Sequence, residues 1–209
     1  MDKLDLKRVY HELYSPPVGR VVEVTVPRLQ FLMVDGSGDP NGPAFSAAVQ
    51  ALYMLSYTLR FWAKKHPAPA GWQEFGVAPL EALWHVPGVN GPFAADAPRK
   101  DWRWTAMIMQ PEFIDQTLVD EARVEAADRK PAVDTSRVRL ESFDEGHCVQ
   151  IMHIGPYSEE LPNIQRLDEY MGEHGLSSNG KHHEVYLSDP MKTAPDKLKT
   201  VLRHPVIGR

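Results

Sequence analysis

Residues 147–190 read HCVQIMHIGPYSEELPNIQRLDEYMGEHGLSSNGKHHEVYLSDP, and they contain the order of elements that decides the fold. The first part, which ends at Tyr157, is rich in apolar residues and closes with a Gly-Pro turn, so we expect a strand. Residues 159–175 are typical of a helix that ends at Gly175. Residues 181–190 are extended again, with alternating side chains. The stretch is therefore predicted to form a strand, a turn, a helix and a second strand.

The same order occurs earlier in the chain. Residues 21–40 predict extended chain, interrupted at Pro27 and ended by a glycine turn. Residues 42–65 follow, with apolar side chains three and four positions apart, which predicts a long amphipathic helix at Ala44–Lys64. Two strand candidates come next, at 75–86 and 101–111, separated by a Pro/Gly-rich loop from Pro87 to Pro98. The order thus appears twice, at Phe31–Trp84 and at Cys148–Leu187.

This repetition predicts an α+β protein in which two similar halves share one antiparallel sheet with helices packed on one face. The second long helix is expected at Leu161–Glu173, and a further helix is expected over residues 111–130, opening on Pro111. Residues 194–206 predict a short helix and a final extended segment. Because no Gly/Ser-type linker separates the halves, we expect a single domain over residues 1–209, with halves at approximately 20–128 and 137–209.

Length and composition limit the classes of function. A chain of 209 residues can bury a substantial core, and its net charge of −5 argues against a nucleic-acid partner, which needs a basic face. No segment approaches the roughly 20 apolar residues of a membrane helix, and the N-terminus lacks the apolar core of a signal peptide. The single cysteine, Cys148, excludes an internal disulfide. We expect a cytoplasmic protein without a membrane partner.

Common cofactor and nucleophile motifs are absent from the sequence. The glycine-containing stretch DGSGDPNG at residues 35–42 matches neither the dinucleotide fingerprint nor the P-loop, so a structural turn is favoured. His182 and His183 are neighbours in a strand and face opposite sides, which disfavours a shared metal. No Ser, Cys or Thr lies in a nucleophile elbow. We predict neither a metal nor a cofactor.

Aromatic residues gather around one acidic strand position. Alternation places Glu184 and Tyr186 on one face of their strand and Val185 on the other. Trp84 lies in a second strand, in which Glu81 points away from it unless the strand is bulged. Two interpretations stay open. The rings are core and Glu184 meets solvent, or the rings and Glu184 form a pocket for a flat apolar ligand or a cation.

The chain resembles the GyrI-like small-molecule-binding family, specifically its stand-alone members. The matching segments span most of the chain and are LKRVYHELYSPP, VDGSGDPNGPAFSAAVQALYMLSYTLRF, PLEALW, DWRWTAMIMQPEF, HIGPY and GKHHEVYLSDPMKTAPDKLKTVLRHPV. The resemblance implies two β-α-β-β halves with pseudo-twofold symmetry and a ligand cleft at their junction. Some similar proteins are effector domains of multidrug-responsive regulators, and others resemble enzymes that hydrolyse cyclopropane-bearing, DNA-alkylating natural products. Too few residues precede the matched segments for a helix-turn-helix, which disfavours the regulator role.

These observations lead to a set of site hypotheses. The family's central acidic residue corresponds to Glu184, which is expected to orient and deprotonate water if the protein is a hydrolase. The expected ligand-binding residues are Trp84, Trp104, Tyr53, Tyr57, Tyr186, Glu81 and Tyr157. Detoxification by hydrolysis of a strained electrophile is one hypothesis, and a non-catalytic drug-sequestering or effector-sensing module is the alternative. A third hypothesis, an accessory protein acting on another macromolecule, has less support. The natural ligand, the oligomeric state and any protein partner are left open.

Overall fold

The structure is a computed structural model that describes residues 3–89 and 93–208 of the chain. Residues 90–92 of the predicted Pro87–Pro98 loop, and the extreme ends of the predicted domain, lie outside the described residues. No described helix combines the length and the apolar character needed to cross a membrane.

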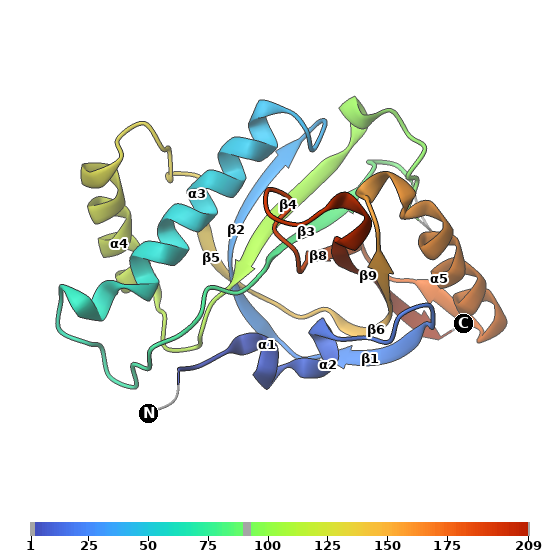
Figure 1. The fold of residues 1–209 in the computed structure, drawn as a ribbon, viewed down its shortest axis with the longest axis horizontal. Helices are drawn as coiled ribbons and strands as arrows, with labels where there is room; N and C mark the ends of the chain where they lie inside the picture. Colours follow the sequence, from blue (N-terminus) through green and yellow to red (C-terminus); the bar gives the residue numbers. More distant parts are fainter. Residues whose placement is uncertain (1–2, 90–92, 209) are drawn as a thin grey trace.

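The described chain contains five α-helices and nine strands (Figure 1). The helices are α1 (Leu6–Val9), α2 (His11–Tyr14), α3 (Pro43–Arg60), α4 (Gln116–Arg129) and α5 (Leu161–Glu173). The strands are β1 (Val22–Val26), β2 (Leu29–Ser37), β3 (Leu80–His85), β4 (Arg103–Met109), β5 (Arg139–Phe143), β6 (Gly146–Ile154), β7 (Leu176–Ser178), β8 (His182–Tyr186) and β9 (Lys199–Gly208). Single 3-10 turns occur at η1 (Trp62–Lys64), η2 (Arg99–Asp101), η3 (Tyr157–Glu159) and η4 (Pro195–Lys197).

The strands form one antiparallel sheet in the order β1-β6-β9-β8-β3-β4-β2-β5, with β7 added beside β9. The first half is β2-α3-β3-β4 and the second is β6-α5-β8-β9. Their equivalent strands, β3 and β8, pair at the centre of the sheet, with Ala82 opposite Glu184. The predicted α+β fold with two related halves is confirmed. The centre of the sheet is also where the two halves meet.

The edges of the sheet are exchanged between the halves. β1 precedes β2 in the sequence but pairs with β6, and β5 precedes β6 but pairs with β2. Each half therefore supplies the outer strand of the other. The boundaries at 20–128 and 137–209 stay a prediction, since the sheet is continuous through the centre.

The long helices α3 and α5 lie on one face of the sheet, as predicted (Figure 1). α3 packs on β2 and β4, while α5 packs on β6 and β9 through Ile164, Leu167 and Met171. The short helix α2 lies on the opposite face, where the Tyr14 hydroxyl donates to Glu81. Alternating residues of the central strands therefore face different elements, with the long helices on one face and α2 on the other.

Helix boundaries agree closely with the sequence, with local exceptions. α5 has the predicted bounds, whereas α3 ends at Arg60 and continues only as the 3-10 turn η1. α4 begins at Gln116 rather than at the predicted Pro111, because the Asp115 side chain caps the helix by accepting a hydrogen bond of 2.8 Å from the Leu118 amide. The short helix expected within residues 194–206 is the single 3-10 turn η4.

Candidate functional site

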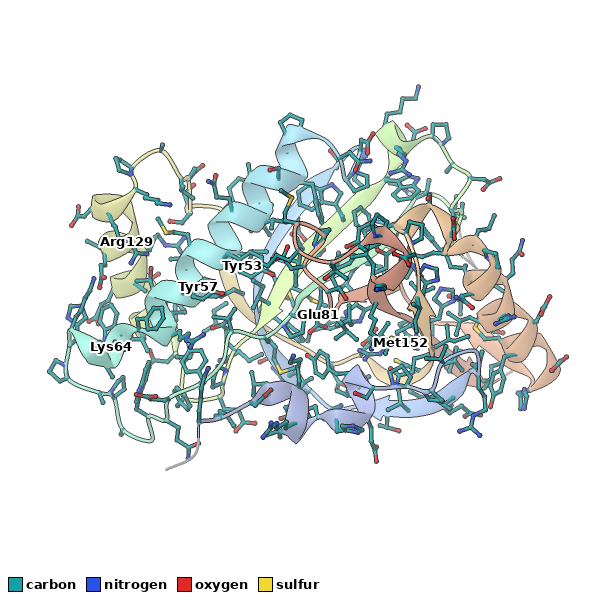
Figure 2. All side chains as sticks on the ribbon, viewed as in Figure 1. Tyr53, Tyr57, Lys64, Glu81, Arg129 and Met152 are labelled. Atoms are coloured by element: carbon teal, nitrogen blue, oxygen red, sulfur yellow. The ribbon has the colours of Figure 1, made fainter. Side chains whose placement is uncertain are left out.

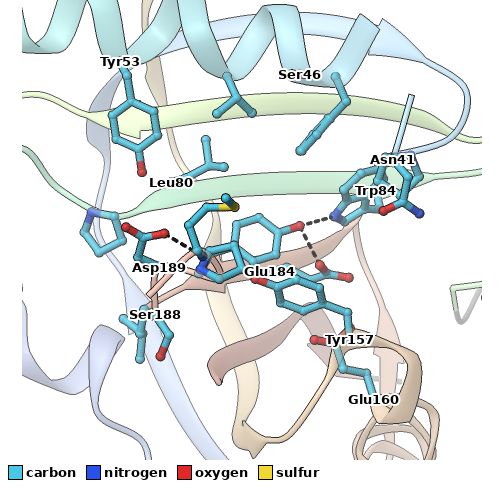
Figure 3. Close-up of a pocket in the computed structure, with 18 of the residues that line it drawn as sticks. Asn41, Ser46, Tyr53, Leu80, Trp84, Tyr157, Glu160, Glu184, Ser188 and Asp189 are labelled. Atoms are coloured by element: carbon cyan, nitrogen blue, oxygen red, sulfur yellow. Dashed lines mark hydrogen bonds between the residues drawn. The ribbon is translucent and has the colours of Figure 1, made fainter. Parts of the chain in front are cut away.

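A cleft of about 1010 Å³ opens between α3 and the central strands β3 and β8 (Figure 3). The start of α5, together with η3, closes one side, and the segment Ser188–Met191 after β8 closes another. Its volume is at the upper end of the range of small-molecule sites. The cleft lies at the junction of the two halves, where β3 meets β8.

One wall of the cleft is a row of side chains along α3. Phe45, Val49, Tyr53 and Tyr57 are four positions apart, so they project from the same side of the helix. The rings of Tyr53 and Tyr57 stack with centroids 6.2 Å apart, and both labelled tyrosines follow α3 in Figure 2. Tyr57 is 43% exposed, which places it at the mouth of the cleft. The row forms a flat aromatic rim.

The deeper wall is built around Trp84 on β3. Its ring is 5.3 Å from that of Phe45 and 5.6 Å from that of Trp102, both measured between centroids. Its indole Nε1 donates a hydrogen bond of 3.2 Å to the hydroxyl of Tyr186 (Figure 3). Since this bond uses the only polar atom of the indole, Trp84 presents an apolar surface to the cleft.

Glu184 lies on the cleft side of β8 and is only 8% exposed. One carboxylate oxygen, Oε2, accepts a hydrogen bond of 2.6 Å from the Tyr186 hydroxyl. The other, Oε1, lies 3.1 Å from Nε2 of His182. Each oxygen has a further lone pair, so the carboxylate can still accept a hydrogen bond from a molecule in the cleft. The strand position that alternation singled out is therefore inside the cleft.

A second carboxyl group, that of Glu160, lines the same cleft. Burial, followed by the nearby charge of Glu184, raises the pKa of Glu160 well above its ordinary value. Its Oε1 is buried and makes no hydrogen bond of normal geometry within the described residues, and the nearby Thr200 hydroxyl lowers the pKa only as a lesser effect. Burial and the charges of Glu160 and Glu184 also raise the pKa of Tyr157 to about 12. The cleft thus holds a carboxyl group and a phenol whose pKa values are both raised, beside the carboxyl group of Glu184.

The structure brings six of the eight predicted site residues into the cleft lining. These are Glu184, Trp84, Tyr53, Tyr57, Tyr186 and Tyr157.

Trp104 does not line the cleft, which corrects its predicted position. Its ring lies behind Phe45, edge-on at 5.0 Å between centroids, and is 2% exposed. The ring also lies over Gly36, its partner in the neighbouring strand, where a Cβ atom would come within 2.1 Å of it. Trp104 supports the aromatic wall from behind. Sequence alternation identified its face but not the side chain in front of it.

Glu81 does not line the cleft either. β3 has no bulge in its register with β8, so Glu81 points to the opposite face from Trp84. There it accepts hydrogen bonds of 2.6 Å from Tyr14 and of 3.0 Å involving Nε2 of His183. It is 2% exposed. Its environment is a closed, buried network rather than a ligand site.

Sequence reasoning missed several lining residues. Phe45 and Val49 belong to the apolar spacing that predicts the helix, and their four-residue spacing with Tyr53 and Tyr57 is a signal that the row continues into the cleft. Glu160 precedes α5 and gave no periodic signal, because only the packing of α5 over β9 carries it to the cleft. The described residues hold no group of three or more His, Cys, Asp or Glu side chains arranged as a metal site.

Comparison with known proteins identifies the family. Residues 111–207 match the GyrI-like small molecule binding domain. A solved structure of an uncharacterized conserved protein from Listeria innocua is 41% identical, with a TM-score of 0.91, over 98% of this chain and 100% of that chain. The chain belongs to the GyrI-like small-molecule-binding family.

Two further similarities differ in what they show. A hydrolase from Listeria innocua is 40% identical, with a TM-score of 0.89, over 99% of this chain and 100% of that chain. The EcmrR C-terminal domain is 11% identical with a TM-score of 0.56, covering 91% of this chain and 98% of that chain, and shows the shared fold alone. No curated protein sequence matches the chain.

Proposed function

We propose that the protein hydrolyses cyclopropane-bearing electrophiles that bind in the aromatic cleft, with Glu184 as the general base. The observation that carries the proposal is the pairing of two carboxyl groups in different environments. Glu184 is held by two hydrogen-bonding partners, and Glu160 lacks a partner for its buried oxygen among the described residues. A hydrogen-bonded carboxylate and a buried carboxyl group with a raised pKa can serve as base and acid in one site.

The chemistry follows from these roles. Glu184 takes a proton from water, and the water oxygen forms a bond to a ring carbon of a cyclopropane that is conjugated with a carbonyl group. A carbon–carbon bond of the ring breaks, and its electron pair moves to the carbonyl oxygen. The neutral carboxyl group of Glu160 supplies a proton to that oxygen. One water is added, and no oxidant or reductant is needed.

The aromatic walls fit the proposed substrate class. Trp84, Trp102 and Tyr157 offer ring surfaces to a flat molecule. A cleft filled by such a ligand excludes bulk water, which strengthens the electrostatic effect of the acid–base pair. The hydrolase from Listeria innocua, at 40% identity over almost the whole chain, adds support to the catalytic hypothesis.

The test uses Glu184→Gln, which keeps the shape and removes the basic oxygen. The probe is a planar aromatic compound with a carbonyl-conjugated cyclopropane, and mass spectrometry follows the gain of one water. We expect turnover to fall by about 10²–10⁴-fold, the contribution of general-base catalysis, while tryptophan quenching still reports binding. Glu173→Gln, an exposed change on α5, is the matched control. Hydrolysis at the parent rate in the Glu184 variant contradicts the proposal.

A second candidate function is non-catalytic capture of aromatic cations. It is favoured by the carboxyl group of Glu184 lying among ring faces, an arrangement that binds cations by charge and by the ring quadrupole. Under this hypothesis Glu184→Gln weakens the binding of ethidium and leaves neutral 9-anthracenemethanol unchanged. No probe then gains a water in the parent protein. The two functions therefore give opposite results with the same variant.

A further inference from the structure

A chain of polar side chains leads from Glu184 away from the cleft. Nε2 of His182 lies 3.1 Å from Glu184, and Nδ1 of the same ring lies 2.8 Å from Nε2 of His204. Nδ1 of His204 in turn faces Oδ1 of Asp168 at 3.7 Å. This series of side chains thus connects the cleft carboxylate on β8, through β9, to α5.

The fold creates this alignment from three separate elements. His182 and Glu184 are two positions apart on β8, so they share the cleft face. His204 lies on the adjacent strand β9, and Asp168 lies on α5, which packs over β9. Both imidazoles are closed off from solvent, with side chains 0% and 3% exposed, whereas the Asp168 side chain is 30% exposed. The series of side chains is therefore buried at the two imidazoles and reaches solvent at Asp168.

The last contact of the chain is left open. Neither Nδ1 of His204 nor Oδ1 of Asp168 has a hydrogen-bond partner within the described part of the chain, although both atoms are buried. Two buried polar atoms that face each other at 3.7 Å need only a small side-chain movement to form a hydrogen bond. Catalytic hydrogen bonds are often long in the absence of ligand. A purely structural role does not explain why Nδ1 of His204 and Oδ1 of Asp168 face each other without a hydrogen bond.

We propose that His182, His204 and Asp168 form a proton relay that carries the proton taken up by Glu184 out of the cleft to solvent at α5. The inference rests on the proposed role of Glu184 as a general base. It assigns His182 and His204 as residues that restore that base after each turnover.

The proton balance of the relay follows from the ring geometry. Protonated Glu184 donates to Nε2 of His182, Nδ1–H of His182 passes to Nε2 of His204, and Nδ1–H of His204 passes to Asp168. Each imidazole gains one proton and loses one, so both stay neutral and change from the Nδ1–H to the Nε2–H tautomer. Both rings return to the Nδ1–H tautomer by ring rotation before the next turnover. Asp168 then releases the proton to solvent. Charge is moved along the chain without forming a buried imidazolium.

The surroundings favour a neutral His204 ring and strengthen the hold of Asp168 on a proton. Burial lowers the pKa of His204 well below its ordinary value, and the charge of Glu145 opposes this only as a lesser effect. Burial raises the pKa of Asp168, which His182 partly offsets. Phe93 stacks on His182 with centroids 4.8 Å apart and an interplanar angle of 6°, so an aromatic ring covers the middle of the chain.

The first test reads the tautomers directly, with ¹⁵N-histidine-labelled protein and two-bond ¹⁵N–¹H spectra. We expect the neutral rings of His182 and His204 to share one tautomer, and we expect His204 to stay neutral between about pH 5 and 8, where an ordinary histidine titrates. Asp168→Asn should shift the nitrogen resonances of both His182 and His204, and the exposed neighbour change Glu169→Gln should shift neither. Different tautomers in the two neutral rings, a protonated His204 in this range, or an unmoved His182 overturns the relay.

The second test uses turnover of the cyclopropane probe. Asp168→Asn should lower kcat by about tenfold or more without changing KM. This loss is smaller than the full contribution of general-base catalysis, because Glu184 itself is retained. Asp168→Glu should recover most of the loss. An unchanged kcat in Asp168→Asn, with hydrolysis by the parent intact, overturns the relay and leaves the proposed function standing. If the parent hydrolyses no probe, the proposed function and the catalytic role of the relay both fail, and the spectra alone decide whether the proton chain exists.

Discussion

Acidic residues lie on both faces of the central strand pair β3 and β8, and the two faces differ in how completely the carboxyl oxygens are hydrogen-bonded. On the cleft face, Glu184 and Glu160 lie near each other, and a buried oxygen of Glu160 has no partner among the residues described. On the opposite face, both carboxylate oxygens of Glu81 and both of Glu145 have hydrogen-bonding partners. Both faces are built from the same strands and by the same alternation. The difference lies in what covers them.

The opposite face is a closed network with balanced charge. His183 lies 3.0 Å from Glu81 and 2.9 Å from Glu145, and Arg203 donates to Glu145 at 3.1 Å. Tyr14 completes the coordination of Glu81. Two carboxylates thus meet one guanidinium and one imidazolium, and Arg203 also donates to the backbone oxygen of Leu13 at 2.7 Å. This network fastens α2 to the sheet.

The hydrogen-bonding partners of a buried carboxyl group indicate whether its role is structural or functional. The network around Glu145 satisfies its charges and so has a structural role. The cleft leaves an acid group unsatisfied, at a cost in stability that is common at functional sites. Four expected outcomes test this division.

The largest expected effect comes from Arg203→Met, which removes the guanidinium and keeps an apolar side chain of similar length. Two buried carboxylates then face one imidazolium, so we expect a loss of about 3–5 kcal/mol in the free energy of unfolding. Urea denaturation measures it. Arg139→Met, which breaks an exposed pairing with Asp35 and Glu141, should cost less than about 1 kcal/mol. Equal losses in the two variants would refute the structural role of the network.

The second prediction is a stability plateau between about pH 4.5 and 6.5. Burial opposes the charged form of Glu145, but His183 and Arg203 outweigh it and lower the pKa to about 2. Stability from this group is present above the unfolded-state pKa and is lost as the pH falls toward 2. Burial also opposes charge on His183, but Glu145 outweighs it and raises the pKa to about 9. That contribution is present below the unfolded-state pKa and is lost as the pH rises through 9.

Unfolding free energies measured across pH should therefore fall on both sides of the plateau, each by about 1–3 kcal/mol. His183→Gln should remove the alkaline decline in particular. Persistence of that decline in the variant would show that another group causes it.

The third prediction concerns Glu160 in the cleft. Its pKa is raised by burial and by Glu184, so its contribution to stability is present below the unfolded-state pKa and is lost as the pH rises. Glu160→Gln removes this loss. We expect the variant to match the parent in acid and to exceed it near neutral pH by about 0.5–2 kcal/mol, the range of single stabilising changes. The adjacent exposed change Glu159→Gln should have no such pH-dependent gain.

The smallest expected effect is at the mouth of the cleft. Tyr57 is 43% exposed, and a ring face at an exposed site contributes about 0.5–1 kcal/mol to binding a cation. Tyr57→Ser should weaken ethidium binding by about two- to fivefold, measured by tryptophan quenching. Val124→Ser, an exposed change on α4 away from the lining, is the control. Unaltered affinity in the tyrosine variant would limit the binding surface to the deeper wall.

The sequence by itself determined the elements and their faces. Strand and helix periods are local, so alternation placed Glu184 and Tyr186 opposite Val185, and it pointed Glu81 away from Trp84. The repeated order of elements likewise predicted the two halves, and the bounds of α5 agree with its spacing and its glycine stop. These features require no information from distant parts of the chain.

Only the tertiary structure decided which side chains meet. Glu160 reaches the cleft because α5 packs over β9, and Trp104 is hidden because Phe45 from α3 lies in front of it. The pairing of His182 with His204 depends on β8 lying beside β9, and the exchange of β1 and β5 depends on both halves folding together. Such contacts join residues far apart in the sequence, and no local periodicity records them. The physical reason is that periodicity assigns a side chain to a face, whereas the packing of other elements on that face selects its neighbours.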